Sequence, residues 1–148
     1  MHVIKGTVKI NAQEVFKNID VKKTNLKISL FASLVKSTAL ARAAVIENIK
    51  DGGKSLNWPR FSSSTIARKT ERGRSLYGLV DTGRMMDSVH ESIDHLRLEG
   101  HVYPGVNYLK YHEEGTKRIP SRKTFEPVPK QINSRVIDIF KTEILGAI

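Results

Sequence analysis

The sequence predicts an α+β fold in which an antiparallel sheet is packed by one long N-terminal helix and a C-terminal helix, with a long loop in between. Two stripes of helical spacing, over residues 24–50 and 128–145, and two β-rich segments, over residues 3–10 and 88–106, support this prediction. The 148 residues are 39% apolar and 27% charged, which suits one domain over 1–148 with its own core. The absence of cysteine excludes a disulfide framework and a thiolate zinc site.

The first half of the chain should contain one strand and the longest helix. β-Branched residues between Val3 and Ile10 predict the strand. Thr24 or Asn25 could cap the helix, and Asp51-Gly52-Gly53 should stop it. The apolar stripe of this helix is formed by Leu26, Leu30, Leu34, Ala41, Val45 and Ile49. Its wide apolar band predicts contacts on more than one side.

Residues 52–80 read as an extended basic loop. Glycine, proline and a serine run interrupt this segment, and apolar residues are too sparse for a core strand. Unstructured segments of this length are unusual inside a compact domain, so we expect the loop to become ordered on assembly. A short helix over 62–71, capped by the serines at its start, is compatible with the same residues.

The second half should return to the sheet and end in a helix. Val89 and Ile93 share one face of a predicted strand, and Glu99-Gly100 offers a turn into the next strand. A short helix over 108–114 should end at Gly115. The C-terminal helix should bury the stripe made by Ile132, Val136, Phe140 and Ile144.

No secretory or membrane-spanning segment is expected. The first residues lack the long apolar run of a secretory signal. The most apolar stretch, residues 26–49, carries Lys27, Lys36, Arg42 and Glu47, so we predict no contact with a membrane.

The net charge of +10 lies entirely in the first half of the chain. Residues 1–74 hold 15 basic and 5 acidic residues, whereas residues 75–148 hold 10 of each. This asymmetry indicates either a solubilising surface or a face that meets a polyanion or an acidic partner. The densest cluster, our candidate for that contact, is Arg60, Arg68, Lys69, Arg72 and Arg74. This cluster lacks the interleaved aromatic residues of a surface that binds single-stranded nucleic acid. A basic nucleic-acid-binding module nevertheless remains the alternative function.

Motifs for catalysis are absent or incomplete. The segment 51–55 ends like a phosphate-binding loop, but Asn48 stands where that motif needs its first glycine. His90 and His95 are five residues apart, a spacing that places them on different faces of a helix or a strand. We therefore expect no enzyme, catalytic residue, metal or cofactor, and an enzyme acting on an acidic substrate ranks third among the functions considered.

Two segments carry residue types that core packing explains poorly. Around Asp81-Thr82-Gly83-Arg84, side-chain oxygens, a flexible glycine and a projecting guanidinium suit a tight polar turn. In the second segment, residues 105–125, a small aromatic helix leads through Gly115 into a basic arm that contains Pro120. Ordinary alternatives for these segments are a helix cap or hairpin turn and, for Tyr111 and Phe125, a place in the core.

Together these segments resemble the bacteriophage virion morphogenesis family, the tail completion and head-to-tail joining proteins of tailed phages. The matching residues are Trp58-Pro59, Asp81-Thr82-Gly83-Arg84-Met85, Ser88-Val89, Tyr108, His112, Gly115, Ile119-Pro120-Ser121-Arg122 and Phe125. The order and spacing of these elements fit the family over residues 58–140. The first 25 residues have no clear counterpart in it.

The resemblance implies a structural protein of the virion, made in the host cytoplasm and assembled into the tail or neck. It also implies a homo-oligomeric ring, expected to be a hexamer, that contacts other neck, tail-tube or head-connector proteins. Genomic DNA passing through the ring is a further possible partner of the basic residues. Candidate subunit or partner contacts are Asp81, Thr82, Gly83, Arg84, Tyr111, Gly115, Arg118, Pro120, Arg122 and Phe125.

Overall fold

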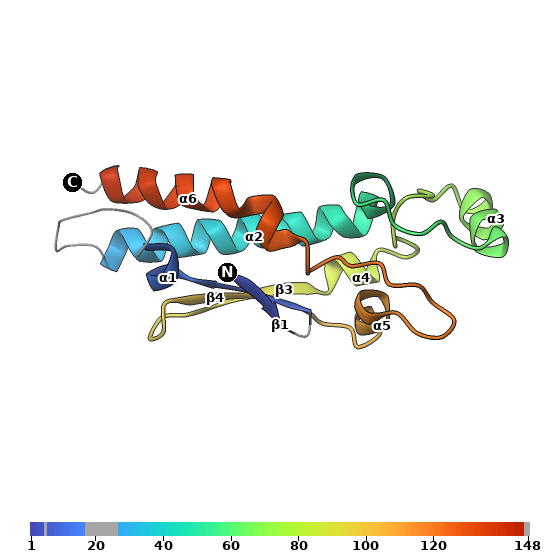
Figure 1. The fold of residues 1–148 in the computed structure, drawn as a ribbon, viewed down its shortest axis with the longest axis horizontal. Coiled ribbons are helices and arrows are strands. Elements are labelled where there is room, and N and C mark those ends of the chain that lie inside the picture. Colours follow the sequence, from blue (N-terminus) through green and yellow to red (C-terminus); the bar gives the residue numbers. More distant parts are fainter. Residues whose placement is uncertain (5, 17–26, 147–148) are drawn as a thin grey trace.

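The computed structural model describes residues 1–4, 6–16 and 27–146. Its elements are β1 (His2–Ile4), β2 (Thr7–Asn11), α1 (Ala12–Phe16), α2 (Lys27–Ser55), α3 (Ser63–Glu71), α4 (Arg84–Asp87), β3 (Val89–Asp94), β4 (Glu99–Pro104), α5 (Leu109–Glu114) and α6 (Val128–Gly146). The predicted α+β architecture is confirmed. Helix α2 packs on β3 and β4, and α6 lies along α2 and α1 (Figure 1). The molecule is elongated, with α3, α4 and α5 gathered at the end away from the carboxyl terminus.

The sheet has four antiparallel strands in the order β1-β2-β4-β3. In the central pair Val8 faces Val102, and in the outer pair Val89 faces Pro104. The single strand predicted over residues 3–10 is instead a hairpin of β1 and β2. Gly6, with a φ of 73°, lies in the turn between them. A positive φ costs glycine little, and this explains why the chain reverses there.

Helix α2 is the scaffold that the sequence predicts, but it runs past the predicted stop. Its backbone breaks at Asp51 (φ −141°, ψ 17°) and then makes one further helical stretch to Ser55. The cap candidates Thr24 and Asn25 lie outside the described residues. By length and composition α2 is long and apolar enough to span a membrane. However, Leu34 and Val45 are fully buried between the sheet and α6, which is the position of a core helix.

The C-terminal helix α6 buries the predicted stripe. Ile132, Val136, Phe140 and Ile144 are at most 1% exposed. They join β2, β4 and α2 in one apolar cluster, so the domain has a continuous core.

The turn between β3 and β4 lies at residues 95–98, not at Glu99-Gly100 as predicted. Leu98, in the observed turn, has a positive φ of 52°. Gly100 is needed inside the strand instead, because a Cβ atom there would lie 1.9 Å from Oγ1 of Thr38 on α2.

The segment 52–80 is a folded connection rather than an extended loop. It contains α3, the short helix that the serines predict, and the Ser62 hydroxyl accepts a hydrogen bond from the Thr65 amide. The segment then folds back along the end of α2, where the Leu79 amide donates to the Ile49 carbonyl at 2.7 Å. Gly78 fits this approach because a Cβ atom there would lie 1.9 Å from the Lys50 carbonyl oxygen.

Candidate functional site

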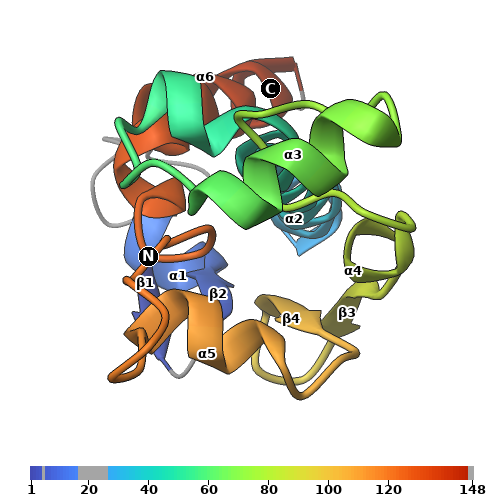
Figure 2. The same cartoon turned by 90° about the vertical axis from the view of Figure 1, so that its right-hand side faces the viewer.

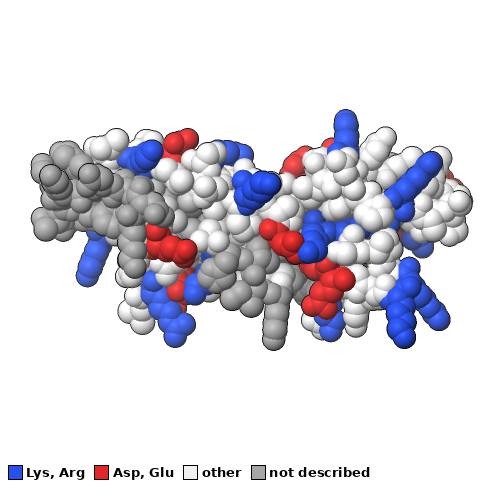
Figure 3. Space-filling view, viewed as in Figure 1, with Lys and Arg blue, Asp and Glu red and all other residues white. Residues whose placement is uncertain are grey.

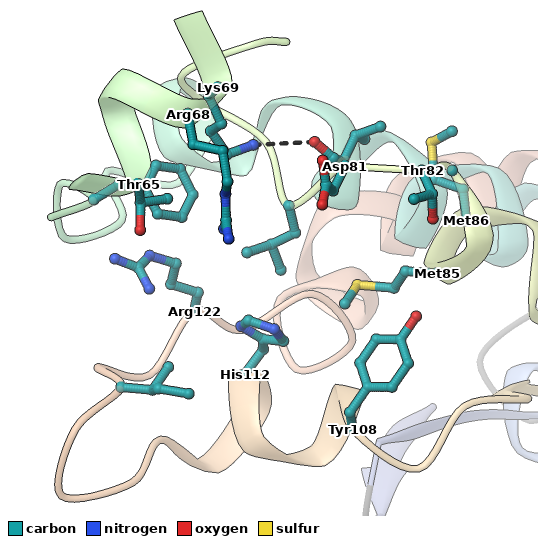
Figure 4. A pocket seen from close by; sticks show the side chains of 15 residues that line it. Thr65, Arg68, Lys69, Asp81, Thr82, Met85, Met86, Tyr108, His112 and Arg122 are labelled. Atoms are coloured by element: carbon teal, nitrogen blue, oxygen red, sulfur yellow. Dashed lines mark hydrogen bonds between the residues drawn. The ribbon is translucent and has the colours of Figure 1, made fainter. Parts of the chain in front are cut away.

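Figure 2 views the molecule from the end that carries α3, α4 and α5. Residues of this end line a cavity of about 450 Å³. It is lined by Phe61, Thr65, Arg68, Lys69, Leu79, Val80, Asp81, Thr82, Gly83, Met85, Met86, Tyr108, His112, Ile119 and Arg122. The cavity therefore joins the two motif segments and part of the basic cluster, although they are far apart in sequence (Figure 4). Basic side chains also project from this end of the surface (Figure 3).

Lys69 is part of the wall and is not free to meet a polyanion, which corrects the prediction for this residue. Its side chain is buried, and Nζ donates to the carbonyl oxygens of Gly78 (2.8 Å), Val80 (3.0 Å) and Ser75 (3.2 Å). One of these bonds is dashed in Figure 4. Burial lowers the pKa of Lys69, with smaller contributions from neighbouring charges. The ammonium group thus holds the folded-back segment against α3.

Asp81 forms an ion pair within the chain. Its two carboxylate oxygens accept hydrogen bonds from Nη1 of Arg72 at 2.9 and 3.2 Å. The hydrogen bond from Arg72 holds the pKa of Asp81 below its usual value. In the basic cluster, Arg60, Arg68 and Arg74 are exposed and form no salt bridge among the described residues, although Arg68 and Arg74 interact electrostatically with Asp81. Arg68 is the one of these three that lines the cavity.

The corner after Asp81 has the geometry that its residues predict. Gly83 precedes α4 with a φ of 86°, and the Thr82 hydroxyl accepts a hydrogen bond from the Arg84 amide at 3.4 Å. The Arg84 side chain is exposed. Within the described part of the chain it has no ion-pair partner, so its predicted role in an interface stays open as a prediction.

Arg122 is buried, only 5% exposed, which corrects its prediction as an exposed contact. Its Nε and Nη2 atoms donate to the Pro59 carbonyl at 3.1 and 3.0 Å, and Nη2 also donates to the Arg60 carbonyl at 3.2 Å. The guanidinium carbon lies 4.4 Å from the centre of the Phe61 ring. Burial lowers the pKa of Arg122. Among the described residues no carboxylate lies within ion-pair distance of it.

Phe125 is also inside the chain, fully buried in the core, so the prediction of an interface anchor is wrong for this residue. The buried Glu113 carboxylate fixes the adjoining backbone by accepting hydrogen bonds from the amide and hydroxyl of Thr124 and from the Phe125 amide. These bonds join α5 to the segment that leads into α6.

The remaining arm residues differ in exposure. Gly115 ends α5 with a φ of 74°, and a Cβ atom there would lie 2.9 Å from the Ser121 amide, so this glycine serves the turn of the arm. Tyr111 is 47% exposed, and Arg118 and Pro120 are exposed. These three residues can still reach a partner.

His112 contributes an unpartnered polar atom to the site. Its Nδ1 is buried and has no hydrogen-bond partner among the residues that the structure describes. Burial, and then the nearby positive charge of Arg122, lower the pKa of His112 below its ordinary value of 6.5. The neutral imidazole is therefore the form that this wall favours.

Nothing in the sequence marks Phe61 or Met86 as a site residue, and His112 and Tyr108 stand out only as motif positions. The spacing of these four residues along the sequence does not predict a shared cavity. The cavity forms through long-range contacts, such as that between Arg122 and Pro59, which are 63 residues apart. The described residues hold no group of three or more His, Asp or Glu placed to bind a metal ion. Among the described residues that line the cavity, Asp81 is the one carboxylate, and it is paired with Arg72.

Comparison with known proteins gives one relative with no described activity. No protein-family model matches the chain, and no solved structure matches it. The uncharacterized protein MJ0331 of Methanocaldococcus jannaschii is 30% identical over 96 residues, which cover 61% of this chain and 71% of that protein.

Proposed function

We propose a function from the motifs and the geometry of this chain, which belongs to the same family as the uncharacterized protein MJ0331. The protein is a structural subunit of a tailed bacteriophage and forms a ring, expected to be a hexamer, at the head–tail interface. It acts there as a tail completion, tail terminator or neck joining protein during virion assembly. It binds copies of itself and other neck, tail-tube or head-connector proteins.

One observation carries this proposal. The two segments on which the phage resemblance rests meet at one end of an elongated domain, around a single cavity. Three side chains of these segments are not buried in the core and remain exposed at this end: Arg84, Tyr111 and Arg118. A ring subunit needs two different faces for its neighbours, and exposed Arg and Tyr residues are typical anchors of such contacts.

The experiment combines particle analysis with one pair of variants. Native mass spectrometry of the purified protein should reveal a closed ring, and the protein should be present in purified virions. Arg84→Ala should keep the melting temperature of the parent protein and block the joining of heads to tails. Arg135→Ala, which removes an exposed arginine from α6, is the matched control and should assemble normally. A protein that stays monomeric at every concentration and is absent from virions contradicts the proposal.

A nucleic-acid-binding module is the second candidate, favoured by the exposed Arg60, Arg68 and Arg74. Such a module binds a short duplex with an affinity that falls steeply as salt increases, because bound cations release counterions from the phosphates. This candidate function is favoured if the parent protein binds the duplex at moderate salt and the Arg60→Gln and Arg74→Gln variants do not. No binding at low salt eliminates it.

A further inference from the structure

The cavity wall contains a buried positive charge without a counter-charge. Arg122 is 5% exposed, and its contacts are two carbonyl oxygens and one aromatic face. These contacts use Nε and Nη2, whereas no described residue accepts a hydrogen bond from Nη1. A buried cation is costly unless an anion compensates it. The geometry therefore leaves a place for an anion beside Arg122.

A second cation faces the same space. Arg68 extends from α3 and lines the cavity, and it interacts electrostatically with Asp81 but forms no salt bridge with a carboxylate of the described residues. Figure 4 shows that Arg68 and Arg122 come from different elements on neighbouring walls. A guanidinium group can bind a planar carboxylate through two parallel hydrogen bonds.

Apolar and adaptable side chains also line the cavity. Leu79, Met85, Met86 and Ile119 stand beside polar ones such as Thr65, Thr82 and His112. Methionine side chains adjust to differently shaped apolar groups. A volume of about 450 Å³ holds a few side chains.

We propose that this cavity binds a peptide segment of another protein through an acidic side chain flanked by apolar ones. The carboxylate lies between Arg68 and Arg122, and the flanking apolar side chains pack on the methionines. This inference rests on the proposed function only for the identity of the partner, which is a neighbouring protein of the virus particle.

The apolar side chains of the wall favour a peptide over a nucleic acid at this site, because they can bury apolar side chains of a peptide. The Phe61 ring, which could otherwise stack on a base, lies beneath the guanidinium of Arg122, and Nζ of Lys69 lies 5.1 Å from its centre. The Phe61 ring is therefore not open for stacking on a base.

The test uses the full chain and three synthetic peptides in calorimetric titrations. Acetyl-Gly-Leu-Asp-Leu-Gly-amide should bind. Replacing Asp by Asn, or the first Leu by Ser, should weaken binding about tenfold, the effect of losing one charge-assisted hydrogen bond or one buried aliphatic side chain. Equal affinity for the Asp and Asn peptides, or no binding of either in the millimolar range, overturns the proposal.

Variants locate the binding site. Arg122→Gln removes the buried charge but also disturbs the fold, because Arg122 holds the 59–60 backbone. Arg68→Gln is therefore the second variant, with Arg74→Gln as a control that is exposed but does not line the cavity. Arg68→Gln should weaken binding of the Asp peptide at least fivefold and Arg74→Gln should leave it unchanged. Equal effects of the two variants overturn the proposed site.

Competition identifies the class of ligand. Displacement of the peptide by a short oligothymidylate at lower concentration would assign the cavity to nucleic acid and overturn the proposal. Self-association that blocks the peptide would assign it to a second copy, with the same consequence. These results are independent of virion assembly, so a chain that binds the peptide but is absent from particles overturns the phage role alone.

Discussion

The Nζ atom of Lys69 lies 2.8 Å from the carbonyl oxygen of Gly78, and through this contact α3 holds the segment that folds back along α2. A lysine in a basic cluster thus stabilises the backbone from inside. The cavity depends on it, because the same ammonium group also binds the carbonyl of Val80, a residue of the cavity wall.

Lys69→Met should destabilise the protein by about 1–3 kcal/mol, because it leaves buried carbonyl oxygens without a donor. Urea unfolding measures this loss, and limited proteolysis should show new cleavage within 72–80. Arg74→Gln, an exposed change in the same segment, is the control and should alter stability by less than about 0.5 kcal/mol. A stable, protease-resistant Lys69→Met protein would contradict this role.

Glu113→Ala should cost about 3 kcal/mol, since it removes a buried carboxylate that accepts three hydrogen bonds from Thr124 and Phe125. Glu114→Ala changes the exposed neighbour and should be nearly neutral. Thermal unfolding of the two variants gives the comparison. Equal melting temperatures would show that the carboxylate does not hold the segment between α5 and α6.

Gly78→Ala should destabilise the fold by about 3 kcal/mol, the upper part of the range for overpacking. The added methyl group would meet the Lys50 carbonyl oxygen at 1.9 Å, and backbone cannot rotate away as a side chain can. Gly146→Ala is the matched control, because nothing lies within 4 Å of its Cβ position. Denaturant unfolding should separate the two, and a neutral Gly78→Ala would mean that the end of α2 yields easily.

Acid should destabilise the protein through His112. The folded-state pKa lies below the ordinary value of 6.5, so the unfolded chain takes up the proton first as the pH falls. The contribution of the neutral His112 to the free energy of unfolding is therefore complete above about pH 6.5. It decreases as the pH falls toward the folded-state pKa. Unfolding free energies at about pH 7.5 and about pH 5 should differ less for His112→Gln than for the parent protein. An identical difference in both proteins would remove His112 as the cause.

The sequence predicted the helices well because their signal is periodic and local. The stripe through Val136 and Phe140 repeats at helical spacing, and burial follows from that spacing alone. The turns were harder to predict. Leu98 adopts a positive φ, whereas Gly100, which looked like the turn residue, is required by its contact with Thr38.

The candidate site was predictable only in part. The polar corner at Gly83 follows from local turn chemistry, and the structure has it. The burial of Lys69 and Arg122 does not follow from local chemistry. A lysine or arginine is written the same way in the sequence whether its charge faces solvent or binds a carbonyl oxygen. The partners of Arg122 are 62 and 63 residues away, and such distances leave no local pattern.

The pairing of β2 with β4 sets a condition on how the chain folds. Asn11 and Glu99 are hydrogen-bonded neighbours across these strands, yet 88 residues separate them. Loop closure over such a distance is entropically slow, whereas α2 and the β3–β4 hairpin need only nearby residues. We expect the amino-terminal hairpin to dock last, so that during synthesis on the ribosome it waits for its partner strand until most of the chain has emerged.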